Sequence, residues 1–195
     1  MAPFDADPRW LGDAAWTIDA SSGAEPPYAP HTPPVDTSTF KDVLARLASG
    51  VAIISCWDGR TPRGLLVSSI TGLSVDPPRF LFCVRKEASS HDALLRADAC
   101  GVAILSTEDE DEAQRFASPA RAIERFTAGR WDLARPEAPW LRGGLASSLC
   151  DVDTVIDAGG HSIVLVTARH CLSRPGAPLV AFDRTLAAVA PLPAA

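Results

Sequence analysis

Hydrophobic positions along this chain repeat with a helical period in only a few short segments, and elsewhere they form the brief apolar runs that are typical of strands. Turn-forming pairs such as Asp58-Gly59 and Gly159-Gly160 separate neighbouring runs, as hairpin connections require. The predicted strands are Val51–Trp57, Gly64–Ile70, Arg79–Arg85, Gly101–Leu105, Gly144–Asp157, His161–Leu172, Leu179–Phe182 and Leu186–Val189. Many strands with hairpin-type connections predict a mainly β fold, an antiparallel Greek-key-type β-barrel with a few helices.

Helical periodicity is clearest between Thr37 and Ser49, where Gly50 supplies a stop signal. The apolar positions of this segment follow the i, i+3, i+4, i+7 pattern and are Phe40, Val43, Leu44 and Leu47. Two shorter helices are predicted at His91–Asp98 and Glu108–Ala117. Residues 120–142 are mixed and rich in Arg, Pro and Trp, which indicates a long excursion between elements.

The composition divides the chain into three parts. Residues 1–37 are rich in Pro, Ser, Gly and Ala and lack sustained periodicity, which predicts an extended arm. Trp10, Leu11 and Trp16 are apolar exceptions in this arm, and they either dock on the domain or a second subunit or belong to a mobile tail. Residues 38–190 form the predicted folded domain, and residues 191–195 form a short tail.

Charge and hydropathy narrow the class of protein. Hydrophobic residues make up 47% of the 195 residues, and the formal net charge is −6. Lysine occurs only as Lys41 and Lys86, and the basic residues are scattered, which argues against a nucleic-acid partner. No apolar run approaches the ~20 residues needed to span a bilayer, and MAPFDADPRW lacks the features of a signal peptide. We therefore expect a cytoplasmic protein that binds neither nucleic acid nor membrane.

Motifs for several other chemistries are missing from the sequence. The five cysteines include no C-x-x-C pair. His161 and His170 are nine residues apart on one predicted strand, so they should face opposite sides, and no metal site is expected. Neither G-x-G-x-x-G, a P-loop nor G-x-S-x-G occurs, which leaves the corresponding nucleotide-binding and hydrolase functions without support.

The segment Arg63–Pro78 is the strongest candidate for ligand binding. Its strand is followed by small hydroxyl side chains and one glycine, namely Ser68, Ser69, Thr71, Gly72 and Ser74. Pro77-Pro78 then ends ladder pairing, because proline lacks an N–H donor. Hydroxyl and backbone donors in such a loop suit an anionic or planar ligand, although a plain hydroxyl-rich turn has the same composition.

Three further segments each have a functional and a structural interpretation. Lys86 and Ser89-Ser90 form either a phosphate-binding corner or the start of a capped surface helix. Arg125-Phe126 either covers a planar ligand or packs the 120–142 excursion against the barrel. His161, after two glycines, is either a functional histidine or an exposed residue of a hairpin turn.

In this order, these segments resemble the short-chain flavin reductases, which are the reductase components of two-component flavin-dependent monooxygenases. The most specific part is S-S-x-x-x-x-S-x-D-P-P, which stands here as SSITGLSVDPP. Other matching segments are SSHDALLRADACGVAIL, RFASPARAIERFTAGRW, APWLRGGLASSLCDV, GGHSIVLV and APLVAFDR. The resemblance runs from about Phe40 to Val189. It implies an FMN-binding split barrel, usually a homodimer with the flavin near the subunit interface.

The resemblance also implies roles for individual residues. His161 matches the histidine of the family's G-D-H motif, which is associated with nicotinamide binding, and it is the implied catalytic residue. Gly160 stands here in place of that motif's aspartate, and Asp157 is a candidate substitute. The implied flavin-binding residues are Ser68, Ser69, Thr71, Gly72, Leu73 and Ser74 for the ring and ribityl chain, Ser89, Ser90 and Lys86 for the phosphate, and Arg125 and Phe126 beside the cofactor.

The leading prediction is an NAD(P)H:flavin oxidoreductase. It would transfer a hydride from NADH or NADPH to FMN or FAD and supply reduced flavin to a partner monooxygenase. The alternative is a flavin-binding split-barrel protein that holds its flavin tightly, or has a repurposed ligand site, and lacks nicotinamide-dependent reductase activity. The missing aspartate at position 160, together with the arm that carries Trp10 and Trp16, motivates this alternative.

Overall fold

The computed structural model describes residues 34–127 and 129–190. Contacts between Cα atoms divide the chain into two units, Met1–Asp36 and Thr37–Ala195. The predicted arm with Trp10, Leu11 and Trp16, and the predicted tail at 191–195, lie outside the described residues. Their predicted roles, and the boundary after residue 37, stay predictions.

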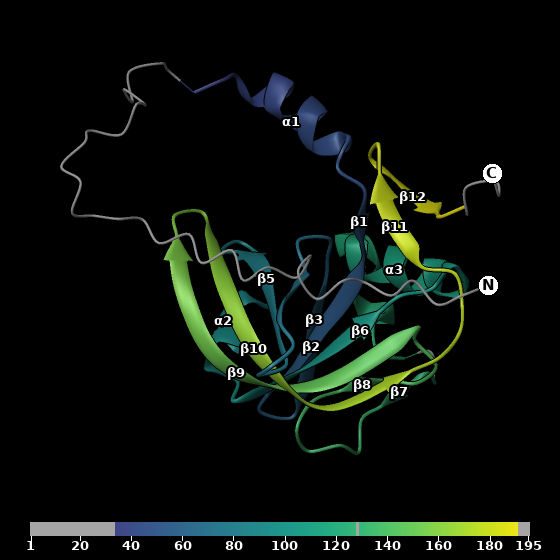
Figure 1. Ribbon diagram of the computed structural model, residues 1–195. Coiled ribbons are helices and arrows are strands. Elements are labelled where there is room, and N and C mark those ends of the chain that lie inside the picture. Colours follow the sequence, from purple (N-terminus) through teal and green to yellow (C-terminus); the bar gives the residue numbers. More distant parts are fainter. Residues whose placement is uncertain (1–33, 128, 191–195) are drawn as a thin grey trace. The chain divides into compact units, whose positions relative to one another are not determined.

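A strongly curved seven-stranded antiparallel sheet forms the body of the second unit (Figure 1). Its spatial order is β3 (Thr61–Val67), β2 (Ala52–Asp58), β6 (Ala99–Ile104), β9 (Ala146–Ala158), β10 (His161–Ser173), β5 (Arg79–Arg85) and β4 (Thr71–Ser74). No ladder joins the edge strands β3 and β4 within the described part of the chain, yet only Ser68–Ile70 separates them in sequence. The short connection therefore brings the two edges of the sheet together.

Smaller elements surround this sheet. A three-stranded sheet pairs β1 (Ser49–Gly50) with β11 (Leu179–Phe182) and β12 (Thr185–Ala188), and β7 (Trp131–Asp132) pairs with β8 (Trp140–Leu141). The helices are α1 (Thr37–Ala45), α2 (His91–Arg96), the 3-10 helix η2 (Thr107–Asp109), α3 (Glu110–Ala117) and the 3-10 helix η3 (Pro119–Glu124). The expectation of a mainly β split barrel with few helices is confirmed.

Two differences from the predicted elements have a clear physical reason. The predicted first helix extends to Ser49, but α1 ends at Ala45 because Ser49 pairs with Ala181 of β11. Thr71–Ser74 is predicted as a loop, but it forms β4 because β5 offers it a free edge. In both places, pairing with a strand distant in sequence decides the structure, and the local pattern carries no sign of that partner.

The core lies on both faces of β2. Ala52, Ile54 and Cys56 belong to one cluster inside the curved sheet, together with Phe82. Ile53 belongs to a second cluster on the opposite face, where α3 and the β7–β8 pair cover the sheet. Because both faces are covered, β2 has a continuous apolar run in place of the alternation of a half-exposed strand.

Gly64 lets the second core cluster pack directly on β3. A Cβ atom at this position would lie 2.8 Å from a ring carbon of Phe116 and 3.0 Å from one of Phe126. These two rings meet edge to face with centroids 5.1 Å apart, and Trp131 packs against both. The indole N–H of Trp131 donates to Glu112 over 2.8 Å, which holds this aromatic cluster to α3.

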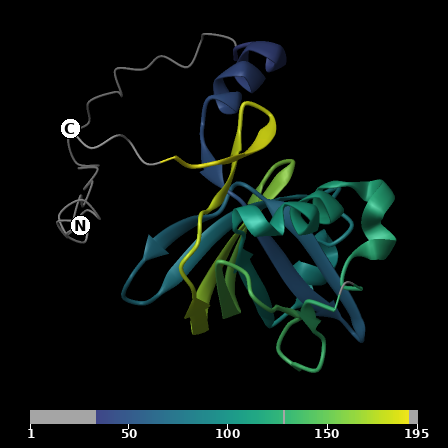
Figure 2. The ribbon, with the colours of Figure 1, turned by 90° about the vertical axis from the view of Figure 1, so that its right-hand side faces the viewer.

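Helix α1 has an apolar face that the described residues leave uncovered. Val43 is 61% exposed and Leu47, just after the helix, is 63% exposed; Phe40 and Leu44 are each 50% exposed. The helix stands beside the β11–β12 hairpin (Figure 2). Such a face on a helix is typical of an interaction surface.

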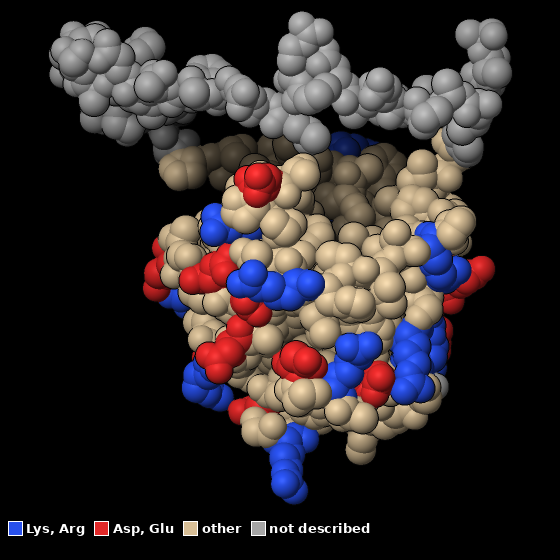
Figure 3. Space-filling view, turned by 60° about the horizontal axis from the view of Figure 1, so that its bottom comes forward, with Lys and Arg blue, Asp and Glu red and all other residues tan. Residues whose placement is uncertain are grey.

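The surface elsewhere carries interleaved charges. On the face seen in Figure 3, Lys and Arg side chains alternate with Asp and Glu. Among the described residues, ion pairs between partly exposed side chains include Arg79–Asp153 at 3.3 Å and Arg121–Asp111 at 3.0 Å. None of the helices in the described ranges has the length and apolar character required to cross a membrane.

All five cysteines are free thiols. Cys56, Cys100 and Cys150 are buried, and the first two have raised pKa values. For Cys56, burial, followed by the charge of Asp58, raises the pKa to about 11. For Cys100, the main cause of the raised pKa is a hydrogen bond with Cys150, its cross-strand partner. Within residues 34–127 and 129–190, no cluster of three or more His, Cys, Asp or Glu side chains is arranged to hold a metal ion.

Two isoleucines test the assignment of the core. Ile54 is fully buried in the first core cluster, whereas Ile123 is 87% exposed on η3. Ile54→Ala should lower the free energy of unfolding by about 2–5 kcal/mol, because it removes buried methyl groups and leaves a cavity. Ile123→Ala should change it by less than about 0.5 kcal/mol. Urea denaturation of both variants measures this, and equal losses would contradict the assignment.

Candidate functional site

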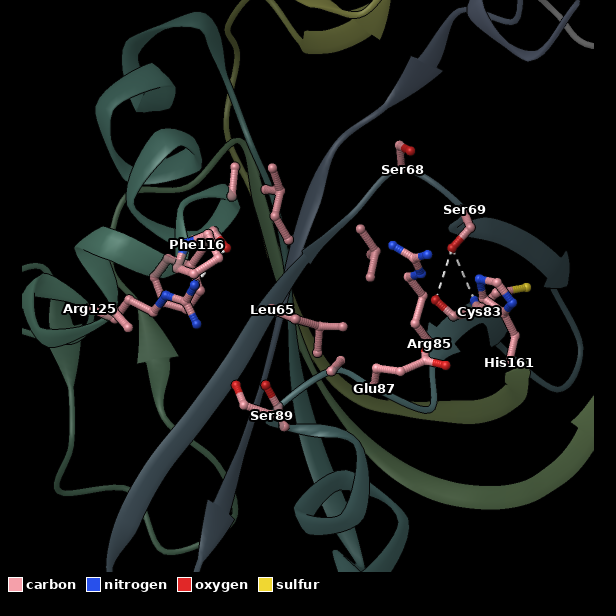
Figure 4. Close-up of a pocket in the computed structure, with 17 residues that line it drawn as sticks. Leu65, Ser68, Ser69, Cys83, Arg85, Glu87, Ser89, Phe116, Arg125 and His161 are labelled. Atoms are coloured by element: carbon pink, nitrogen blue, oxygen red, sulfur yellow. Dashed lines mark hydrogen bonds between the residues drawn. The ribbon is translucent and has the colours of Figure 1, made fainter. Parts of the chain in front are cut away.

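A cleft of about 840 Å³ opens where the two edges of the seven-stranded sheet come together (Figure 4). Its walls come from β3 and the connection Ser68–Ser69, from β5 and the loop that follows it, from the end of α3 and η3, and from the first residue of β10. Leu65, Phe116 and Pro119 give it apolar surface, while serine and arginine side chains supply donors. A volume of this size is typical of a small-molecule site.

The cleft brings together half of the residues predicted to form the site. Those that line it are Ser68, Ser69, Ser89, Ser90, Arg125 and His161. These residues come from four separate parts of the chain, and the fold alone makes them neighbours. The predicted residues that do not line it are Thr71, Gly72, Leu73, Ser74, Lys86 and Phe126.

The connection Ser68–Ser69 is fixed to β5 by a pair of hydrogen bonds. The Ser69 hydroxyl donates to the carbonyl of Cys83, and the Cys83 N–H donates to the same hydroxyl oxygen, each over 3.1 Å. Figure 4 shows both bonds on the side of the cleft where His161 lies. Ser68, next to it, is exposed. Ser69 therefore anchors the connection, whereas Ser68 is exposed at the wall of the cleft.

Ser89 and Ser90 differ in their availability. Ser90 is 2% exposed, and its hydroxyl donates to the carbonyl of Gly64 over 2.9 Å, so its donor is already used. It gives no side-chain cap to α2. Ser89 is exposed at the wall of the cleft. Of the two, Ser89 offers a free hydroxyl, and Ser90 holds the loop against β3.

Arg125 projects its guanidinium to the cleft from the side of α3 and η3 (Figure 4). It donates to the carbonyls of Arg115 and Phe116, each over 3.0 Å, and to that of Ser118 over 3.2 Å. No carboxylate of the described residues forms an ion pair with it, and partial burial lowers its pKa. The structure thus places a cation without a balancing charge in the wall of the cleft.

The predicted residues of β4 lie along the exposed edge of the sheet. Thr71, Gly72 and Leu73 are exposed, and the Ser74 hydroxyl donates to the carbonyl of Pro77. The resemblance grouped them with Ser68 and Ser69 as residues that contact the ring and ribityl chain of a flavin. Pairing with β5 instead carries them away from the connection.

Lys86 and Phe126 also have structural partners. The Lys86 ammonium binds the Asp157 carboxylate at 2.6 Å, and this bond, followed by the Gly159 N–H, lowers the pKa of Asp157. Phe126 packs in the aromatic cluster with Phe116. Asp157 therefore faces Lys86, and no hydrogen bond joins it to His161 in the described structure. For Phe126, the interpretation as packing of the excursion fits the structure.

His161 begins β10 and pairs directly with Arg85 of β5. The turn before it consists of Gly159 and Gly160, because Ala158 is the next paired residue. Arg85 and Glu87 also line the cleft, and the sequence prediction missed both. The available signal was the end of the predicted strand at Arg85, since the last residue of a strand in a barrel commonly faces the opening.

A second groove adjoins the cleft. It has a volume of about 470 Å³ and lies between α1 and the β11–β12 hairpin. Leu44, Leu47 and Phe182 give it an apolar lining, and Ser68 and Ser69 line both the groove and the cleft. The connection between β3 and β4 is therefore the wall that the two cavities share.

The arrangement of the cleft suits a planar, apolar ligand that carries an anionic group. Leu65 and Phe116 offer apolar contact, whereas Ser68 and Ser89 offer hydroxyl donors. Arg125 adds a positive charge that no carboxylate of the described residues balances, which favours an anionic group, while its Nε and Nη2 hydrogens already donate to backbone carbonyls. A flavin mononucleotide has these properties, because its ring is flat and its ribityl chain ends in a phosphate.

Comparison with known proteins identifies related chains. Residues 44–190 match the family described as flavin reductase like domain. The actinorhodin polyketide dimerase of Streptomyces coelicolor is 32% identical over 160 residues, which cover 79% of this chain and 87% of that protein. The reductase subunit HsaB of a flavin-dependent monooxygenase from Rhodococcus jostii is 33% identical over 65% of this chain, and the match spans 64% of its length.

A solved structure agrees with this relationship. The NADH:FAD oxidoreductase SgcE6 of Streptomyces globisporus, in complex with NAD and FAD fragments, superposes with a TM-score of 0.74 at 25% identity. The superposition covers 84% of this chain and 98% of that one. Because the family match covers most of the chain, this protein belongs to the flavin reductase like domain family.

Proposed function

We propose that this protein is an NAD(P)H:flavin oxidoreductase that reduces FMN or FAD. The observation that carries the proposal is the cleft itself, which joins apolar surface, serine hydroxyls and an unbalanced arginine in a chain of this family. The relatives include a protein named as a reductase subunit and one whose structure holds NAD and FAD fragments. Reduced flavin would serve a partner monooxygenase.

The described residues divide the binding of flavin among three walls. Ser68 and the backbone beside it would contact the ring, and Leu65 would pack on its apolar part. Ser89 and Arg125 would hold the phosphate, because both line the cleft and the same small cavity next to it. A bound flavin would supply the redox chemistry by accepting a hydride. The protein contributes binding, orientation and electrostatic stabilisation.

His161 would lie beside the nicotinamide. It is exposed at the opening of the cleft, across the two-strand ladder from Arg85. Direct hydride transfer needs no acid or base at the reacting carbon, so His161 would bind and orient the donor. Position 160 has no carboxylate here, and Asp157 is engaged by Lys86. No carboxylate is therefore in place to fix the orientation and tautomer of the His161 imidazole.

A homodimer fits the exposed apolar face of α1. Four large apolar side chains lie on or next to this short helix, and each is at least half exposed. A second copy of the chain would bury them by a two-fold contact, which is the commonest symmetry of homo-oligomers. We place the protein in the cytoplasm, where the nicotinamide and flavin pools are available.

The competing function is a flavin-binding protein without nicotinamide-dependent activity. The engagement of Asp157 by Lys86 favours it, since this leaves His161 without a carboxylate partner. One relative named as a polyketide dimerase indicates that names in this family are not confined to reductases. Retention of flavin through purification would support this function.

Steady-state assays with purified protein test the main proposal. With NADH or NADPH and either FMN or FAD, we expect oxidation of the nicotinamide. It is followed as the loss of the absorbance band of the reduced nicotinamide. The visible spectrum of the isolated protein should show little tightly held flavin. No turnover in any of the four combinations would rule out the reductase function, and a yellow, inactive protein would favour the alternative.

Substitution at position 160 tests the orientation of His161. Gly160→Asp should raise kcat/KM for the nicotinamide several-fold, because a carboxylate beside the imidazole would fix its tautomer and direction. The backbone accepts a side chain there, since no heavy atom lies within 4 Å of a Cβ built at Gly160. Gly160→Ala adds the Cβ without the charge and should leave the rate unchanged. If both variants act alike, the carboxylate has no role.

The dimer is tested through α1. Val43→Glu places a charge in the proposed interface and should shift the protein from dimer to monomer in light scattering coupled to size exclusion. Ile123→Glu adds the same charge at an exposed apolar position on η3 and should leave the dimer intact. A dimer that survives Val43→Glu, or a wild-type monomer, would contradict the proposed interface.

A further inference from the structure

We propose that Arg85 binds the diphosphate of the reduced nicotinamide dinucleotide and so sets the affinity for the electron donor. This inference rests on the proposed function and adds a donor-recognition residue to it. The predicted site residues do not include Arg85. The proposal follows from its register, its lack of a partner and the position of the second arginine of the cleft.

Register places Arg85 next to His161. The two residues are direct partners in the antiparallel ladder between β5 and β10. Direct partners project from the same face of a sheet, with Cβ atoms about 4.5–5.5 Å apart. Both line the cleft, and in Figure 4 the Arg85 side chain extends from β5 into it, toward the connection that carries Ser68 and Ser69. A ligand that contacts His161 is therefore within reach of Arg85.

Arg85 has no balancing charge. It is exposed, and no carboxylate of the described residues lies within ion-pair distance of its guanidinium. Its neighbour Lys86 differs in this respect, because the Lys86 ammonium is bound to the Asp157 carboxylate at 2.6 Å. Glu87 is the acidic residue that shares the lining of the cleft with Arg85, and the two form no ion pair. The guanidinium is thus available to an anion from solution.

The cleft has two such arginines, one on each side. Figure 4 shows Arg125 beside Phe116, and Arg85 across the cleft on the side of His161. A ternary complex of this reaction contains two phosphorylated ligands, the flavin and the dinucleotide. Arg125 shares its small side cavity with Ser89, which suits the flavin phosphate. Arg85 stands with the histidine that would contact nicotinamide, so its anion is the dinucleotide's diphosphate.

The chemistry of the side chain fits this role. A guanidinium presents paired donors that match two phosphate oxygens, and it stays charged across the working pH range. Its attraction to a doubly charged diphosphate also speeds the association of the donor with the protein. The association rate should therefore fall as ionic strength rises, because salt screens this attraction.

Donors that differ in phosphate content give the direct test. We would assay Arg85→Gln and wild-type protein with NADH, NADPH, reduced nicotinamide mononucleotide and phosphate-free reduced nicotinamide riboside as donors, and with FMN and riboflavin as acceptors. Arg85→Gln should raise KM for NADH about tenfold, as loss of a charge-assisted pair implies. KM for the riboside should not change, and neither should KM for FMN. Arg85→Lys should recover part of the affinity for NADH.

Arg60→Gln is the matched control. Arg60 is exposed in the turn between β2 and β3, has no ion-pair partner in the described ranges and does not line the cleft. Arg60→Gln changes the net charge by the same amount as Arg85→Gln. Because Arg60 does not line the cleft, this control should leave every KM unchanged. Thermal melting of both variants should match the wild type, because neither arginine is buried.

Four outcomes would overturn the inference. An equal rise of KM for NADH and for the riboside would mean that Arg85 acts by maintaining the structure of the β5–β10 ladder. A higher KM for FMN, with riboflavin unaffected, would assign Arg85 to the flavin phosphate. An effect confined to NADPH would assign it to the 2′-phosphate, and unchanged kinetics would deny it any role.

A binding measurement separates this inference from the proposed function. NADH added to flavin-free protein is followed by its own fluorescence, without turnover. Weaker binding to Arg85→Gln than to wild type supports the inference even if flavin reduction is absent. Wild-type protein that reduces flavin while both proteins bind NADH equally contradicts the inference alone. Absence of NADH binding to wild-type protein overturns it as well.

Discussion

The close approach at Gly64 joins three of the walls that form the cleft. Without a side chain at this position, the ring of Phe116 packs directly on β3, and α3 is held against the sheet. The carbonyl of the same residue accepts a hydrogen bond from Ser90 at 2.9 Å, and Arg125 lies 3.5 Å from it. A methyl group here would displace a ring or the backbone of β2. One small residue thus sets the spacing between β3, the loop after β5 and Arg125, which lines the cleft.

The cations in and beside the cleft differ in the partners that they already bind. Lys86 is neutralised by Asp157, and this pair fastens the loop after β5 to the β9–β10 hairpin, together with the bond from the Lys86 N–H to the Gly160 carbonyl. Arg125 is held by carbonyl oxygens, which fix its position without cancelling its charge. Of these three cations, Lys86 is neutralised in an ion pair, Arg125 is held by carbonyl oxygens, and Arg85 has neither kind of partner among the described residues.

The sequence predicts the strands with apolar runs well and the edge strand β4 poorly. Apolar runs locate β2, β5 and β11 to within a residue or two, and the run of buried residues is longest in β2, because both faces of this strand are covered. The edge strand β4 has no such run, since it is exposed and depends on β5 for its pairing. The same reason divides the site: Ser68 and Ser69 lie in the connection and line the cleft, whereas the four predicted residues of β4, Thr71–Ser74, do not line it. Arg85 escapes prediction because its importance comes from a partner 76 positions later, His161.

The connection Ser68–Ser69 has a consequence for how binding at the cleft is controlled. It forms one wall of the cleft and, with its other side, one wall of the apolar groove under α1. An occupant of the groove that favours one position of this wall changes the free energy of ligand binding on the other side. Thermodynamic linkage makes the effect mutual, so the ligand changes the affinity of the groove's occupant by the same factor. If a second copy of the chain fills the groove through α1, as proposed, its association and the affinity of the cleft for its ligand would be coupled through Ser68 and Ser69.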